Sequence, residues 1–205
     1  MHILSDFKFE IPLWKAGLQV LGIDEAGRGA FAGPLAVAGV LFDKIHAEKL
    51  LAFEINDSKL LSEKKRELLF QEITTHALFS HVELIDLSSI NTMGIGRATT
   101  LGMQRVYEKA AEDFQNLHML IDAFSIPGNA LQTPIVKGDR VSVSIAAASI
   151  LAKVTRDRHM KHLAREYSQY GWDKNKGYGT ADHRNALGYF GATAHHRTKF
   201  IRKYL

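Results

Sequence analysis

Two adjacent acidic residues, Asp24 and Glu25, directly follow a short apolar run and so lie at the end of an expected strand. Two like charges this close oppose each other's ionisation, and a folded protein rarely places them at a half-buried position without a cation to bind. The next residues are well suited to binding a phosphate, because glycine lets the main chain approach a ligand closely and arginine offers a fork of hydrogen-bond donors. Those residues are Gly27, Arg28 and Gly29. Together the two features predict a metal ion beside a phosphodiester.

Two more acidic residues are candidates for the same site. Asp122 follows the apolar residues 117–121, and strand ends in open α/β sheets are where sites usually form. Asp157 belongs to a long expected helix and shares a face with Ser149 and Lys153, at successive steps of four residues. If the four carboxylates meet, they form an oxygen-only cluster, which selects Mg²⁺ or Mn²⁺ over zinc. Two such ions about 3.5–4 Å apart can bind the attacking and leaving oxygens of a phosphoryl transfer.

Ordinary structural roles for the same residues remain open on the sequence alone. The first acidic pair could be solvated before a turn, and Asp122 could start a turn. Asp157 lies between two arginines and could form a surface salt bridge. The segment His195-His196-Arg197 is expected to be a basic surface patch and not a catalytic base. The spacing of the acids does not show that they meet in space.

The composition is that of an ordinary globular protein of 205 residues, with 46% apolar and 23% charged residues. No apolar stretch reaches the roughly 20 residues that span a bilayer, and the first residues do not resemble a signal peptide, so a cytoplasmic location is expected. The chain has no cysteine, which excludes disulfides, thiolate zinc sites and a cysteine nucleophile. Residues 150–205 hold 12 Lys and Arg against 4 Asp and Glu, so this quarter is expected to be either a phosphate-binding surface or an ordinary solvated basic face.

The expected elements form a mixed sheet flanked by helices. Two short apolar runs separated by a glycine-rich turn predict a β-hairpin with a long loop, and two further runs have the pattern of strands. Apolar residues at helical spacing, with Ser62 and Thr180 as N-caps, predict four helices. The predicted strands are 18–23, 35–42, 79–85 and 117–121, and the predicted helices are 62–77, 97–114, 142–167 and 180–189.

In this order, the motifs resemble those of a known family, the bacterial ribonucleases HII. The resemblance extends over about residues 22–197, nearly the whole chain, and the blocks together are far more specific than any one of them. The blocks are Gly22-Ile23-Asp24-Glu25-Ala26-Gly27-Arg28-Gly29, Asp57-Ser58-Lys59, Leu120-Ile121-Asp122, Lys137-Gly138-Asp139, the segment 144–157, Lys176-Gly177-Tyr178-Gly179-Thr180 with His183, and His196-Arg197.

The resemblance implies an RNase H-like fold in one catalytic domain spanning residues 1–205, with a mixed five-stranded sheet flanked by helices and a small, basic, helical extension at about 168–205. It implies cleavage of the RNA strand of RNA–DNA hybrids, and cleavage 5′ to single ribonucleotides in duplex DNA, with two Mg²⁺ or Mn²⁺ ions and with 3′-OH and 5′-phosphate ends. A monomer without a sliding-clamp-binding motif is expected. A non-catalytic hybrid-binding module and another two-metal nuclease are the rival interpretations.

The resemblance also assigns roles to individual residues. Metal coordination and catalysis fall on Asp24, Glu25, Asp122 and Asp157. Contacts to the ribonucleotide 2′-OH and its phosphates fall on Gly27, Arg28 and Gly29, stacking near the RNA–DNA junction on Tyr178, and further substrate contacts on Lys59, Ser149 and Lys153. One departure is that Ala123 and Phe124 follow the third acid, where the family often has glycine, which leaves the contacts on that side of the site open.

Overall fold

The computed structural model describes residues 7–51, 55, 58 and 61–205, and its centre is a five-stranded mixed sheet with the strand order β3-β2-β1-β4-β5. β1 and β2 are antiparallel, as are β2 and β3, whereas β4 runs parallel to both β1 and β5. The predicted mixed sheet and the predicted hairpin are therefore confirmed. The strands are β1 (Gln19–Ala26), β2 (Leu35–Leu41), β3 (Phe79–Ile85), β4 (Leu117–Asp122) and β5 (Leu131–Ile135).

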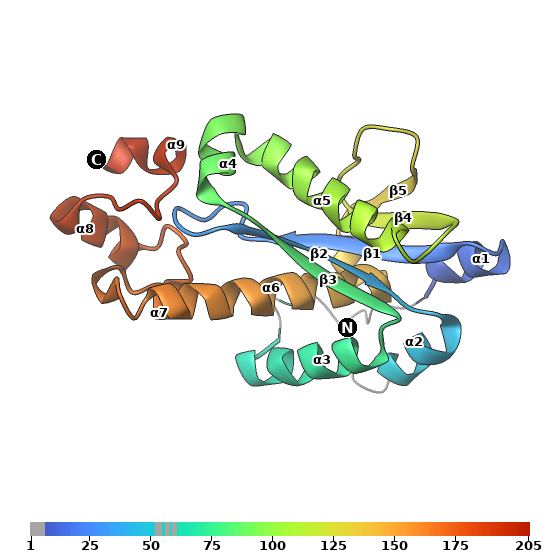
Figure 1. Cartoon of the computed structure of the whole chain (residues 1–205). Helices are drawn as coiled ribbons and strands as arrows, with labels where there is room; N and C mark the ends of the chain where they lie inside the picture. The colour runs from blue at the N-terminus through green and yellow to red at the C-terminus, as the bar shows by residue number, and fades with distance from the viewer. Residues whose placement is uncertain (1–6, 52–54, 56–57, 59–60) are drawn as a thin grey trace.

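Helices cover both faces of this sheet, α5 on one and α6 on the other (Figure 1). The layers explain why β2 is buried along its whole length and is apolar without alternation. Gly22 of β1 permits the close approach of α6, because a Cβ at this position would lie 2.2 Å from the backbone carbon of Ser144. The small residues of α6, Ala146 among them, pack on the same face of the sheet.

All four predicted helices are present, and each begins within two residues of its predicted start. Ser62 Oγ accepts a hydrogen bond from the Lys65 amide, and Thr180 Oγ1 accepts one from the His183 amide, so both expected N-caps are confirmed. No helix in the described part of the chain is long and apolar enough to cross a membrane. The helices are α1 (Glu10–Lys15), α2 (Lys44–Leu51), α3 (Glu63–His76), α4 (Leu87–Met93), α5 (Ile95–Ala111), α6 (Val143–Leu163), α7 (Trp172–Asn175), α8 (Ala181–Phe190) and α9 (Thr198–Ile201), with 3₁₀ turns η1 (Gly138–Arg140), η2 (Ser168–Tyr170) and η3 (Arg202–Tyr204).

The sequence patterns missed β5 and the helices α1, α2, α4, α7 and α9, and they overextended two helices, of which the one predicted at 97–114 ends at Ala111. β5 was not predicted, because it is an edge strand with a half-exposed face and contains Pro134, a residue that edge strands tolerate. The predicted helix 142–167 ends at Leu163. The chain turns there, and Tyr167 packs on Trp172 with their ring centroids 5.5 Å apart.

The segment after α6 packs as a small helical cluster against the end of α6 and against the loop between β1 and β2, residues 27–34. We call this segment, residues 168–205, the C-terminal extension; in Figure 1 it lies at the left, orange to red. Trp172 is fully buried in this extension, so its side chain is not available on a phosphate-binding surface. The buried residues of the cluster are Ala32, Met160, Leu163, Ala164, Tyr170, Trp172, Ala186, Leu187 and Ile201.

Candidate active site

A cavity of about 600 Å³ lies where β1 ends, between the β1–β2 loop, α6 and the C-terminal extension. Several of the residues that the sequence singles out line this cavity, and they come from four separate segments of the chain. The lining residues are Glu25, Ala26, Gly27, Arg28, Gly29, Ser58, Arg66, Ser149, Lys153 and Tyr178.

Three of the four predicted acids lie together at the ends of β1 and β4. Ile23 pairs with Ile121 in parallel register, so Asp24 and Asp122 follow at the same edge of the sheet. The pKa of Asp24 is raised well above its usual value, first by burial and then by the charges of Glu25 and Asp122. Hydrogen bonds from the Glu25 amide and from Ser149 oppose this rise only in part. We call Asp24, Glu25 and Asp122 the acidic cluster.

The position of Asp122 differs from the solvated turn that its sequence context allows. It is half-buried, and its Oδ1 accepts a hydrogen bond of 2.7 Å from the amide of Gly138. This bond fixes one oxygen at the end of β4 through the 3₁₀ turn that precedes α6. The carboxylate is therefore oriented by the protein and is not free to rotate into solvent.

The fourth acid, Asp157, is buried on α6 and is not a surface ion-pair residue. Its Oδ1 accepts a hydrogen bond of 2.8 Å from Lys153 Nζ, one helical turn earlier, and Lys153 lines the cavity. The flanking arginines have other partners: Arg156 is fully buried against backbone carbonyls, and Arg158 forms an ion pair with Glu67. The interpretation of Asp157 as a surface salt-bridge residue is therefore wrong.

The loop residues Gly27, Arg28 and Gly29 form one wall of the cavity. Gly27 has φ +92°, and a Cβ there would lie 2.0 Å from Arg156 Nε, so only glycine fits. At Gly29 a Cβ would meet no described atom within 4 Å, so packing does not require glycine at that position. The Arg28 guanidinium lies 4.2 Å from the Phe124 ring centroid, and its Nη1 lies 3.8 Å from Glu25 Oε1. Phe124, the departure after the third acid, thus supports the Arg28 side chain.

Tyr178 borders the cavity from the C-terminal extension. Its ring centroid lies 5.6 Å from Lys153 Nζ and 5.3 Å from the Arg156 guanidinium carbon. Its backbone carbonyl lies 3.0 Å from His183 Nδ1, and the Nε2 atoms of His183 and His196 are 3.1 Å apart.

The histidine pair has one consistent set of tautomers. The Thr193 amide donates to His196 Nδ1 over 2.9 Å, so that nitrogen carries no proton. His183 Nδ1–H donates to the Tyr178 carbonyl, so His183 Nε2 is an acceptor that Trp172 Nε1–H and His196 Nε2–H share, each over 3.1 Å. Burial lowers the pKa of His196 to about 4 and also lowers that of His183, so both rings are neutral at pH 7.

The donors at this site suit a hard divalent cation. The acidic cluster offers only oxygen ligands, no histidine lines the cavity, and the raised pKa of Asp24 shows carboxylates that would gain from a nearby positive charge. Among the residues that the structure describes, no three acidic or imidazole side chains are already arranged as ligands of one ion. A metal ion at Asp157 would compete with Lys153 Nζ for Oδ1.

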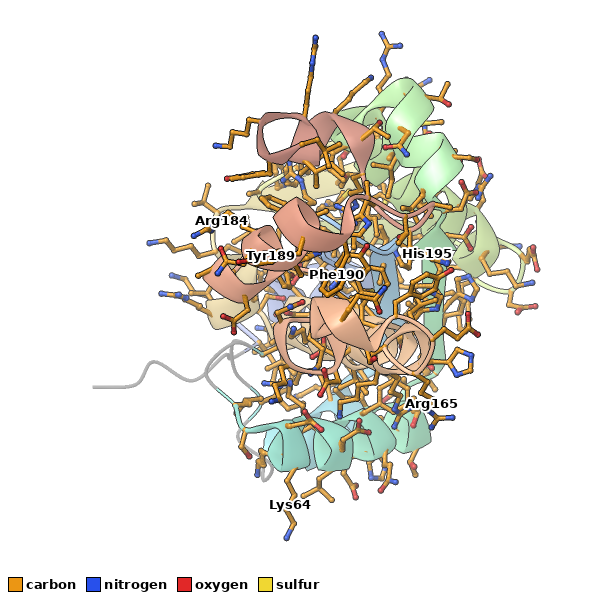
Figure 2. All side chains as sticks on the ribbon, turned by 90° about the vertical axis from the view of Figure 1, so that its left-hand side faces the viewer. Lys64, Arg165, Arg184, Tyr189, Phe190 and His195 are labelled. Carbon is orange, nitrogen blue, oxygen red and sulfur yellow. The ribbon has the colours of Figure 1, made fainter. Side chains whose placement is uncertain are left out.

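The expectation of a basic surface patch at 195–197 is wrong for two of its three residues. His196 and Arg197 are 1% and 0% exposed and belong to the interior, while His195 is half-buried. Cations do lie on the surface of this end of the molecule: Figure 2 shows Arg184 on α8, the helix that also carries the exposed Tyr189 and Phe190, and Arg165 on another side, just after α6. The charge excess of the C-terminal quarter is thus divided between interior and surface.

Three cavity residues, Ala26, Ser58 and Arg66, were not chosen as site residues from the sequence, and two of them bring polar side chains. Ser58 belongs to a block that carries the family resemblance, and its Oγ lies 2.8 Å from Ser149 Oγ. Arg66 of α3 donates from Nη1 to the carbonyls of Ser58 and Leu61. No sequence signal distinguishes Arg66 from the other charges of its helix. The predicted substrate contact Lys59 lies outside the described residues.

Comparisons with known proteins place this site in a family. The profile of the family described as Ribonuclease HII matches residues 21–203. A Ribonuclease HII of Geobacillus sp. (strain WCH70) is 43% identical over 194 residues, which are 94% of this chain and 68% of the relative.

Solved structures agree in fold. The ribonuclease H2 of Pyrococcus horikoshii OT3 has a TM-score of 0.73 at 23% identity, covering 91% of this chain and 97% of that one. The Bst-RNase HIII structure in complex with Mn²⁺ has a TM-score of 0.70 at 23% identity, and the match spans 90% of this chain but only 62% of that protein. The sequence matches and the shared fold together show that this chain belongs to the ribonuclease HII family and is a metal-dependent ribonuclease.

Proposed function

We propose that this protein is an endonuclease that cleaves the RNA strand of RNA–DNA hybrids and cuts 5′ to single ribonucleotides in duplex DNA. The observation that carries the proposal is the buried Asp24, whose pKa is raised by burial and by two neighbouring carboxylates, next to Glu25 in a cavity lined by Gly27, Arg28 and Gly29. An acidic cluster that needs a cation and a glycine-arginine wall that suits a phosphate are the two halves of a phosphodiesterase site.

The acids would hold the metal, and the residues on the other walls would hold the nucleic acid. We assign metal coordination to Asp24, Glu25, Asp122 and Asp157. Two Mg²⁺ or Mn²⁺ ions, when bound, would activate water and stabilise the departing 3′ oxygen, which gives 3′-OH and 5′-phosphate products. The Mn²⁺ in the Bst-RNase HIII complex is consistent with this choice of ion.

Recognition of the ribonucleotide is assigned to the opposite wall. A 2′-OH is what distinguishes RNA from DNA at a given site. Main chain can approach it closely at Gly29, since a Cβ there would meet no described atom within 4 Å. Arg28 is placed to contact phosphate, and the half-buried ring of Tyr178 offers an aromatic surface beside Lys153 and Ser149. Such contacts select the sugar and not the base sequence.

A cleavage assay tests the proposal directly. The substrate is duplex DNA with one ribonucleotide, the control is the same duplex in all-DNA form, and each is incubated with Mg²⁺, Mn²⁺ or a chelator. We expect a single cut 5′ to the ribonucleotide with 3′-OH and 5′-phosphate ends, only with metal and only in the first duplex. Cleavage of both duplexes would indicate a general two-metal nuclease, and binding without cleavage would indicate a non-catalytic hybrid-binding module.

Assembly and location follow as smaller proposals. We propose that residues 1–205 form one catalytic domain that acts as a monomer in the cytoplasm, with RNA–DNA hybrid and ribonucleotide-containing duplex as its partners. Size-exclusion chromatography with light scattering, with and without duplex, measures the oligomeric state. A stable dimer without substrate would contradict the monomer.

A further inference from the structure

The β1–β2 loop, residues 27–34, presents its backbone carbonyls to the interior of the protein. Beyond Gly27, the loop also has a positive φ of 82° at Gly33. A loop with two left-handed glycines has many alternative conformations, so something must select the one that the cavity requires.

The side chain of Arg197 binds this loop with all of its donors. Its Nη1 donates to the carbonyls of Gly27 and Arg28 over 2.7 and 3.0 Å. Its Nε and Nη2 donate to the Gly33 carbonyl over 3.0 and 2.9 Å, and Nη2 also donates to Pro34 over 3.0 Å. These five contacts use the five N–H groups of a guanidinium.

Arg156 of α6 binds the same loop from a second direction. It donates from Nε to the Pro34 carbonyl, from Nη2 to the Ala32 carbonyl and from Nη1 to the Lys176 carbonyl, each over 2.9 Å. Both arginines are 0% exposed, and in the described part of the chain neither has a carboxylate within ion-pair distance. Two buried cations paired with backbone carbonyls are a costly arrangement for stability alone.

Backbone contacts continue the connection to the C-terminal extension. The Arg197 amide donates to the Phe31 carbonyl over 2.7 Å, and the Gly33 amide donates to the His195 carbonyl over 2.9 Å. The Phe31 amide donates in turn to the Gly177 carbonyl over 2.8 Å. The loop is therefore enclosed by two segments of the extension, around residues 177 and 195–197.

We propose that Arg197, together with Arg156, is a positioning residue that fixes the β1–β2 loop in the conformation that presents Gly27, Arg28 and Gly29 to the ribonucleotide. The proposal rests on the proposed function for the role of those three residues. It makes the C-terminal extension part of ribonucleotide recognition, through the loop and without contact to the substrate. Burial lowers the pKa of Arg197 to about 9, which leaves the guanidinium charged at pH 7.

The test compares binding by Arg197→Lys with binding by the unchanged protein, in a chelator so that no strand is cut. Lysine keeps the charge but cannot reach carbonyls on several sides from one nitrogen. We expect affinity for duplex with one ribonucleotide to fall about tenfold, while affinity for the all-DNA duplex changes by less than about twofold. Arg202→Lys, on the exposed turn η3 of the same extension, is the matched control and should change neither affinity.

A double-mutant cycle separates positioning from general stability. If Arg197 acts through the loop that carries Arg28, the loss of affinity in the variant with both Arg28→Ala and Arg197→Lys should be smaller than the sum of the two single losses. Additive losses would overturn the proposal, and so would a folded Arg197→Lys protein with unchanged preference for the ribonucleotide. If the unchanged protein has no preference for the duplex with one ribonucleotide, the proposed function fails. Hydrogen exchange then tests whether Arg197 fixes the β1–β2 loop.

Hydrogen exchange on the unchanged protein supplies a measurement that does not depend on a variant folding. The amides of Phe31, Gly33 and Arg197 should exchange with one common opening free energy, because their hydrogen bonds connect the loop and the extension. Loop amides that exchange at least about tenfold faster than the Arg197 amide would show a loop that opens on its own, and would overturn the proposal.

Discussion

The acidic cluster and the β1–β2 loop lie side by side, and each has buried charge: carboxylates in the cluster and the Arg197 guanidinium beneath the loop. The two differ in how far the chain itself supplies partners for that charge. Beneath the loop, each donor of Arg197 has a carbonyl acceptor within 3.0 Å. In the acidic cluster, Asp24 is buried beside two further carboxylates, and its pKa rises as a result. The first arrangement is complete within the chain, whereas the second is left for a ligand to complete.

The difference teaches how to separate structural from functional charge in this protein. A buried charge whose hydrogen bonds are all satisfied fixes the backbone around it. A buried charge whose neighbours raise its free energy is stabilised when a metal ion or a substrate binds beside it. Substitutions in the two regions should therefore have opposite consequences for folding and for activity.

The largest expected effect is the loss of cleavage in Asp24→Asn. Asparagine keeps an acceptor for the Glu25 amide but removes a negative charge from the cluster. Cleavage in Mg²⁺ should fall by at least about a hundredfold, while the melting temperature stays unchanged or rises because charge repulsion is relieved. Kinetics on a one-ribonucleotide duplex and a thermal melt check both parts. Turnover at the original rate would remove Asp24 from the mechanism.

The next effect compares two glycines of the loop. Gly27→Ala must strain the positive φ and displace Arg156, so the free energy of unfolding should fall by about 2–4 kcal/mol. Gly29→Ala should fold with unchanged stability, because a Cβ at that position meets no described atom, and should still weaken binding of the ribonucleotide duplex. Urea unfolding and binding titrations of the two variants measure the contrast. Equal behaviour of the two glycines would contradict it.

A third effect is the loss of stability in acid through the histidines behind Tyr178. The folded state keeps His196 neutral down to a pKa of about 4, whereas the unfolded chain binds a proton near pH 6.5. Stability is therefore full above pH 6.5 and declines as the pH falls toward 4, by on the order of 3 kcal/mol from this group. Urea unfolding at pH 7, 5.5 and 4 follows the decline. In His196→Gln the decline should be shallower; an identical slope would show that other groups cause it.

The smallest effect concerns the side chain that supports Arg28. Phe124→Leu removes a cation–π contact worth about 0.5–1 kcal/mol at a partly exposed position. Affinity for the ribonucleotide duplex should fall by a few-fold at most, with stability nearly unchanged. Competition binding against the unchanged protein is sensitive enough to measure this. A loss as large as that of Arg28→Ala would mean that Phe124 contacts the substrate directly.

Local patterns in the sequence determined the elements that carry the site. Apolar runs at 18–23 and 35–42 predicted the hairpin, and Ser62 and Thr180 predicted helix starts, because apolar runs, turns and N-capping depend on residues close in the chain. The family motifs located the acids and the glycine-arginine segment. The end of β1 and the end of β4 could be identified as neighbours only through that resemblance.

Tertiary structure alone decided which charges are inside. Arg156, His196 and Arg197 have the sequence context of surface residues, yet all three are buried, because carbonyls and rings distant in the chain supply partners for them. Asp157 is likewise buried, although its partner Lys153 lies only one helical turn away, on the face that the sequence predicted. Burial depends on contacts between segments that are far apart in the chain, and neither charge nor spacing along the chain encodes those contacts.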